Sequence, residues 1–292
     1  MMKSGNILIK YISFVLCTLF TFMMFIACGS QLYKISMESD FDNARAEKSN
    51  PKVNDVTSTV YGIHAITGWK KIPIKFRIGP EMSPEQRSHL YAAMKTWEWA
   101  TGKTLFVFDG LDKSTGDSFP DLFTSLNDSV NGHYLDRNWK KTKKPDYVLA
   151  TTIWLNDAIN KEAISQSDIR FNTQNYLIGD SLVLKQTDDK DVVDMQSLAL
   201  HELGHFLGLA HVNSKVDPDS VMNPSLFIGE GLTTRELSQG DIQRIQTVYG
   251  CEGKACNIEE LVAEASHKKN TTTLNPIDPY TGNPLENTKI SH

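Results

Sequence analysis

The sequence predicts a mixed α/β (α+β) domain over about residues 67–256, and three observations support this fold class. Residues 71–78 alternate apolar and polar side chains, the period of a half-buried strand. Two longer segments, 83–101 and 192–207, are predicted to be helices, and short apolar runs lie between them. The expected order is therefore strand, helix, three strands and two helices, a mixture of elements that favours helices packed on a sheet.

The first half of this order has clear boundary signals. Gly79 and Pro80 end the first strand. Ser83 is a typical helix cap, with proline following it and Gln86 completing a capping box. Gly102 is expected to end this helix, and residues 105–108 form the second predicted strand.

The second half begins with residues 109–145, whose Asp, Ser, Asn, Lys and Gly content predicts a long surface insertion. Strands are expected at 147–155 and 168–172, with a short edge strand at 182–184. The last helix of the domain is predicted to begin at Ser238 and to end at Gly250. Residues 257–292 are expected to be a polar C-terminal tail with a short helix near 259–265.

The N-terminus predicts export. Lys3 and Lys10 precede an apolar run at 11–27, so residues 1–27 are interpreted as a signal peptide. The segment Phe25-Ile26-Ala27-Cys28-Gly29 resembles a bacterial lipobox, which implies a lipid on Cys28 and attachment to a bacterial membrane, in a Gram-negative host the outer one. The polar residues up to 66 would then be a tether. A plain signal anchor is the alternative, and both place the domain outside the cytoplasm, in the periplasm or at the cell surface.

The cysteines agree with an exported protein. Cys251 and Cys256 are an even pair outside the leader, which predicts a disulfide closing a small loop, with two free thiols as the alternative. The formal charge of −5 over 292 residues provides no electrostatic basis for binding nucleic acid.

The segment His201-Glu202-Leu203-Gly204-His205 predicts a metal centre. His201 and His205 are four residues apart, so both imidazoles project from one face of a helix. Gly208 is where the helix would break, because glycine enters the left-handed region freely. That turn would bring His211 back as a third ligand and leave the fourth position of a tetrahedral zinc open, as in catalytic sites.

Glu202 is the predicted general base. It is next to His201, where its carboxylate can reach a water molecule at the metal without being a ligand. Zinc would acidify that water and polarise the scissile carbonyl, and Glu202 would carry the proton to the leaving amine. The other histidines have no partners at such spacing and are expected at the surface: His64, His89, His133, His267 and His292.

The three-histidine string, followed by Ser220-Val221-Met222-Asn223-Pro224, resembles the metzincin metallopeptidases. The resemblance implies a methionine turn with Met222 beneath the zinc. Pro224, two residues after the methionine, is similar to the matrixins within that group, as is the segment 237–250. In this resemblance Asp241 supports the methionine turn.

The matrixin resemblance implies a fold and a substrate. The expected catalytic domain has a twisted, mostly parallel five-stranded sheet with an antiparallel edge strand, and three helices. An extended peptide would bind against that edge, which by position is assigned to residues 181–184. Residues 223–227 would form one wall of a side-chain pocket. The implied activity is that of a monomeric zinc endopeptidase that acts on proteins or peptides.

Several family features are missing from the sequence. In matrixins a cysteine of the pro-segment caps the zinc as a latency switch. Cys28 is the only upstream cysteine of the mature chain and is expected to carry lipid, so no cysteine is available for that switch. The ligands of a structural zinc are absent from 109–185, and calcium, although compatible with the family, cannot be traced to residues. Two alternatives to an endopeptidase remain: a catalytically silent binding lipoprotein, disfavoured by the intact Glu202, and a zinc amidase acting on cell-wall peptides.

Overall fold

The computed structural model describes residues 33–36 and 67–268. The chain divides into two compact units, Met1–Tyr33 and Lys34–His292, and the description below concerns the second. The predicted signal peptide, Cys28, most of the tether and residues 269–292 lie outside the described residues. Among the described residues, no helix is both long enough and apolar enough to cross a membrane.

The elements follow the predicted mixture of strands and helices. The strands are β1 (Tyr33–Ser36), β2 (Gly68–Trp69), β3 (Ile74–Ile78), β4 (Phe106–Leu111), β5 (Gly132–Asp136), β6 (Ala150–Asn156), β7 (Ala163–Asn172), β8 (Tyr176–Gly179), β9 (Asp191–Asp194) and β10 (Ser225–Ile228). The α-helices are α3 (Pro84–Thr101), α4 (Met195–Phe206), α5 (Gln239–Tyr249) and α6 (Ile258–Lys268). The predicted helix at 192–207 begins three residues later, because Val192, Val193 and Asp194 pair with β8 as part of β9.

The main sheet is mostly parallel, as predicted. Its strand order is β2-β7-β5-β3-β4, with β6 on β7 as an antiparallel strand at the edge. The two-residue β2 makes it a six-stranded sheet. The short strands β8 and β9 form a separate parallel pair directly before α4.

The position of the edge strand corrects the prediction. Residues 181–184 form a turn, since the N–H groups of Val183 and Leu184 both donate to the carbonyl of Asp180. Leu182 and Val183 are exposed rather than packed on a sheet. The antiparallel edge is β6, most of which lies in the ordinary strand predicted at 147–155.

The predicted surface insertion also needs correction, because it contains a central strand. β5 lies between β3 and β7, and all five of its residues are buried. His133, expected at the surface, is fully buried with its ring centroid 5.3 Å from those of both Phe76 and Phe206. Burial lowers the pKa of His133 to about 3, so the ring is neutral at physiological pH.

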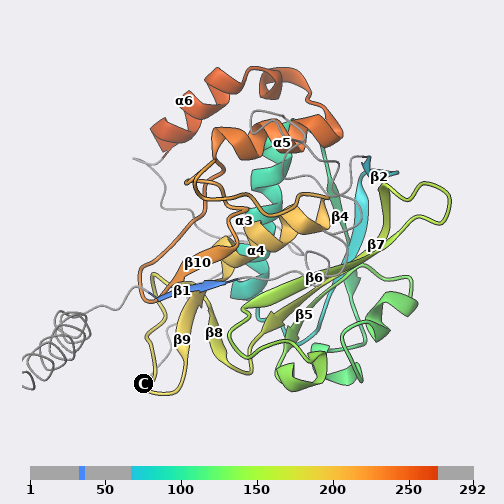
Figure 1. Cartoon of the computed structure of the whole chain (residues 1–292), viewed down its shortest axis with the longest axis vertical. Helices are drawn as coiled ribbons and strands as arrows, with labels where there is room; N and C mark the ends of the chain where they lie inside the picture. The colour runs from blue at the N-terminus through green and yellow to red at the C-terminus, as the bar shows by residue number, and fades with distance from the viewer. Residues whose placement is uncertain (1–32, 37–66, 269–292) are drawn as a thin grey trace, which may run out of the picture. The chain divides into compact units, whose positions relative to one another are not determined.

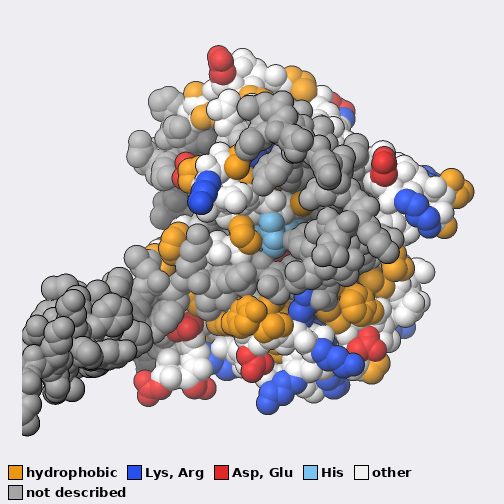
Figure 2. All heavy atoms as spheres, in the orientation of Figure 1, with side chains coloured by type: hydrophobic (Ala, Val, Ile, Leu, Met, Phe, Trp, Pro, Cys, Tyr) orange, Lys and Arg blue, Asp and Glu red, His pale blue; other side chains and the backbone are white. Residues whose placement is uncertain are grey.

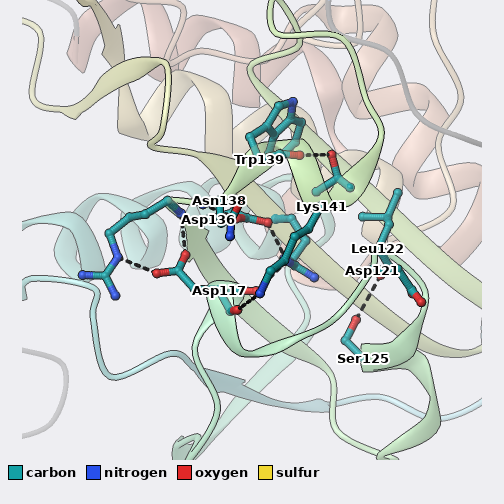
Figure 3. Close-up of polar contacts among 12 residues, drawn as sticks. Asp117, Asp121, Leu122, Ser125, Asp136, Asn138, Trp139 and Lys141 are labelled. Carbon is teal, nitrogen blue, oxygen red and sulfur yellow. Dashed lines mark hydrogen bonds and ion pairs between the residues drawn. The ribbon is translucent and has the colours of Figure 1, made fainter.

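The rest of the insertion covers one face of the sheet. Leu122 and Leu126 pack against Ile153 of β6. Figure 3 shows how polar contacts close these loops, with the Lys141 ammonium donating to the backbone carbonyl of Asp117 at 2.8 Å. Beneath them, Arg170 of β7 and Asp136 of β5 form an ion pair with no side-chain exposure on either partner.

The helices pack on the opposite face. α3 has the predicted capping box between Ser83 and Gln86 and ends at Gly102, which has a φ of 71°. The Trp97 indole of α3 donates to the carbonyl of Leu200 in α4 at 3.0 Å, which fixes the two helices against each other. In Figure 1, α5 lies at the upper end of α3 and α6 lies above α5. Leu261 of α6 is part of the same apolar core as the helices beneath it.

Candidate metal centre

The three predicted ligands meet at one point. His201 and His205 lie on α4 and are 1% exposed, and His211 follows after a turn and is partly exposed. The Nε2 atom of His205 is 3.1 Å from that of His201 and 3.1 Å from that of His211, and the remaining pair is 3.3 Å apart. In residues 33–36 and 67–268, these histidines are the one group of three or more side chains spaced to hold a metal ion. Figure 2 shows a histidine side chain at the surface in the middle of this face.

The second ring nitrogens fix the direction of the lone pairs. Nδ1 of His201 is 2.7 Å from the carbonyl oxygen of Val221, and Nδ1 of His205 is 2.8 Å from that of Leu209. A carbonyl can only accept, so both Nδ1 atoms carry the proton and both Nε2 atoms present a lone pair. Lone pairs that face one another at such distances repel unless a cation lies between them. Tetrahedral zinc at 2.0–2.1 Å from each nitrogen would separate the ligands by about 3.3–3.4 Å, close to what is found.

The turn after α4 is held from outside the helix. Gly208 has a φ of 104°, the left-handed region that favours glycine, and its position matches the prediction. The carbonyls of Phe206 and Leu207 accept from the Trp69 indole at 2.7 Å and from the Tyr249 hydroxyl at 2.8 Å. These carbonyls at the helix end have no partner within the helix, so the two side chains satisfy them and set where His211 returns.

Met222 lies directly under α4. It is fully buried, and a Cβ placed on Gly204 would be 2.2 Å from its sulfur. Glycine is therefore required at residue 204 for the helix and the methionine to approach this closely. The carbonyl of Met222 also accepts from the N–H of Val212, which joins the turn to the third histidine. A glycine inside a predicted helix was the available signal for this contact.

Asp241 holds the methionine turn in place. This carboxylate is fully buried and accepts from the Ser220 hydroxyl at 2.6 Å and from the N–H of Val221 at 2.8 Å. Arg244 donates to Asp241 and to Asp217, at 2.7 Å in each case. The backbone carbonyl of Val221 also accepts from His201, so α5 supports one of the three histidines through a single residue of the turn.

Glu202 follows His201 in α4 and is 1% exposed. Its Oε2 accepts from the hydroxyl of Thr152 at 2.5 Å. Burial raises the pKa of the Glu202 carboxyl to about 8, while the Thr152 hydrogen bond and the charge of Lys144 act in the opposite direction. Nothing in the local sequence pattern singled out Thr152, which is separated from Glu202 by 50 residues.

Residues 223–227, for which the role of a pocket wall stays a prediction, directly follow Met222. Pro224 leads into β10, where Phe227 is 47% exposed.

Beyond α5, Cys251 and Cys256 are joined by the predicted disulfide, with their Cα atoms 5.2 Å apart.

Asp194 sets the start of α4, and its charge predicts acid sensitivity. Its side chain caps the helix through the N–H of Ser197 and also accepts from Arg235. Although burial acts to raise the pKa of Asp194, the hydrogen bonds from Arg235 and Ser197 lower it below the ordinary value. A carboxyl with a depressed folded-state pKa stabilises the fold above its unfolded pKa, and this contribution is lost as pH falls through the folded value.

We therefore expect Asp194→Asn to lower the free energy of unfolding at pH 7 by about 2–3 kcal/mol, with a smaller difference from the unmodified protein below about pH 4. Urea unfolding of metal-free protein across this pH range measures the effect without a contribution from zinc loss. Asp180→Asn, which removes the more exposed partner of Arg235, is the control and should cost less. If the difference in unfolding free energy between Asp194→Asn and the unmodified protein stayed constant with pH, the lowered pKa of Asp194 would be contradicted.

A comparison with protein families places these features in context. The family model described as Matrixin (Peptidase_M10) matches residues 68–250, more than half of the chain. No curated protein matches the chain significantly.

Proposed function

Because the chain belongs to the matrixin family, we propose that it is a zinc-dependent endopeptidase that hydrolyses peptide bonds in proteins or peptides. Matrixins are metallopeptidases that normally bind zinc. The observation that carries the proposal for this chain is the convergence of three Nε2 atoms within 3.3 Å of one another, with the buried Glu202 next to His201 on the same helix.

The donor set suits zinc. Three neutral imidazoles are a common ligand set for catalytic zinc, and they leave one position open. His201, His205 and His211 would hold the ion, and Val221 and Leu209 fix the orientation of two of the rings. Zinc bound there supplies a Lewis acid that polarises the scissile carbonyl and makes water more acidic.

Glu202 is proposed to move the proton. As the attacking water adds to the carbonyl carbon, the Glu202 carboxylate accepts a proton from it, and the same proton then goes to the leaving amine as the C–N bond breaks. Glu202 is 1% exposed, so solvent competes little for this proton. This role needs the ionised carboxylate, which burial alone disfavours and which a zinc cation held by the three histidines would favour.

β6 is the proposed binding edge for the substrate. Among the described residues it pairs with β7 alone, which leaves backbone N–H and C=O groups on its other side for an extended peptide. Thr152 places this strand next to Glu202. The proposed edge is thus close to the proposed general base.

Metal removal tests the function. We expect about one zinc ion per chain by mass spectrometry, and cleavage of a library of internally quenched peptides that is lost with a chelator and restored by zinc. The same library reports cleavage sites. Absence of chelator-sensitive cleavage despite bound zinc would favour a silent binding protein, and cleavage restricted to cell-wall peptides would favour an amidase.

We also propose export with a lipid on Cys28, on the basis of the basic, apolar and lipobox-like segments of the N-terminus. Cys28→Ser is expected to abolish incorporation of labelled fatty acid and to release the protein from the membrane fraction. Labelling that persists in this variant would exclude the assignment.

A further inference from the structure

Thr152 joins the edge strand to the general base. Its side chain is fully buried on β6, and its hydroxyl is 2.5 Å from Oε2 of Glu202 and 3.1 Å from the Glu202 backbone carbonyl. A threonine hydroxyl has one proton, and both of these neighbours can only accept it. The shorter contact leads to the carboxylate, the stronger acceptor when ionised, so the proton lies mainly on that side.

The hydroxyl is itself well fixed. The backbone of Thr152 is paired with Ile169 of β7, and a β-branched side chain has few χ1 rotamers. α4 fixes the other end of the contact, since Glu202 is next to the ligand His201. Among the described residues, Oε1 of Glu202 has no hydrogen bond, whereas Oε2 is occupied by Thr152.

From this geometry, and resting on the proposed endopeptidase function, we propose that Thr152 is a positioning residue for the reaction. Its hydroxyl holds Oε2 and stops the carboxylate from rotating, so that Oε1 is the oxygen that receives the proton of the attacking water. Preorganisation of this kind removes a reorientation step before proton transfer. The hydroxyl makes no covalent bond and carries no proton to the substrate.

A purely structural role is the competing explanation, because the contact to the Glu202 carbonyl also links β6 to α4. The two roles differ in what they alter. Positioning acts on kcat at constant zinc content and stability, whereas a structural link alters stability and the metal site together.

The test compares three variants of the full chain. Thr152→Val keeps the shape and removes the hydroxyl, and Thr152→Ser keeps the hydroxyl. Thr101→Val is the control, since Thr101 is equally buried but lies on α3, where its hydroxyl donates to the backbone carbonyls of Trp97 and Glu98. The readouts are kcat and KM on the peptide of a quenched library that the unmodified protein cleaves fastest, zinc per chain, and the unfolding midpoint.

For Thr152→Val we expect kcat to fall roughly 10- to 100-fold, the range for losing a hydrogen bond to a charged group, with KM within about twofold. Zinc content should not change. Thr152→Ser should recover most of kcat, and Thr101→Val should leave kcat unchanged. In a Glu202→Gln background, Thr152→Val should cause little further loss, because both changes remove the same function.

Unchanged kcat in Thr152→Val, or a loss that Thr152→Ser does not rescue and that accompanies lower stability, would overturn the positioning role alone. An unmodified protein with no chelator-sensitive cleavage would instead overturn the proposed function, and with it this role.

Discussion

Glu202→Gln is expected to lower peptidase turnover by roughly 10²–10⁴-fold, the contribution of a positioned general base, without loss of zinc. The amide has nearly the shape of the carboxylate and can still accept from Thr152 through its oxygen. It cannot accept a proton from water, so the hydrolytic step loses its base. The three histidines that would hold the metal are unchanged.

The measurement combines turnover of a quenched peptide with zinc analysis of the same sample. Glu98→Gln is a matched control, because Glu98 is also buried but lies on α3, where it accepts from the N–H groups of Leu105 and Phe106. This control should alter stability rather than kcat. Near-normal turnover in Glu202→Gln would show that the proton is moved by another group.

Arg170→Met is expected to have the largest effect on stability. The Arg170 guanidinium donates to Asp136 at 2.5 Å and to the carbonyl of Gly116 at 2.6 Å, with no exposure of either charged side chain. Removing the cation leaves the Asp136 carboxylate buried in the sheet, where an uncompensated charge costs about 3–5 kcal/mol. Two nitrogen atoms of Arg170 have no hydrogen-bond partner among the described residues, so burying the guanidinium is itself costly. We therefore expect the loss of stability to lie near the lower end of this range.

Urea unfolding of a double-mutant cycle measures this effect. Arg170→Met/Asp136→Leu should be more stable than Arg170→Met alone, since replacing a whole buried ion pair by apolar side chains is often close to neutral. Arg77→Met is the control at an ion pair with 39% and 37% exposed partners, and should cost at most about 1 kcal/mol. A loss below about 1 kcal/mol for Arg170→Met would mean that Asp136 is neutral or hydrated without its partner.

The grouping of the three histidines could be predicted from the sequence because its geometry is local. His201 and His205 are one helical turn apart, and Gly208 permits the left-handed turn that returns His211, so the spacing itself brings the ligands together. The capping signals at Ser83 and Ser238 are equally local, and both helices begin there. Such features depend on backbone geometry over a few residues, which the sequence encodes directly.

Only the tertiary structure revealed which strands meet. β5 lies in a segment whose composition indicated a surface loop, and it is central because β3 and β7 pair with it on both sides. Leu182 and Val183 have strand-forming side chains, yet a turn at Asp180 leaves them exposed. The contact between Thr152 and Glu202 depends on how β6 packs against α4, across 50 residues of chain. Pairing between distant segments is selected by the packing of the whole core, and no local residue pattern records it.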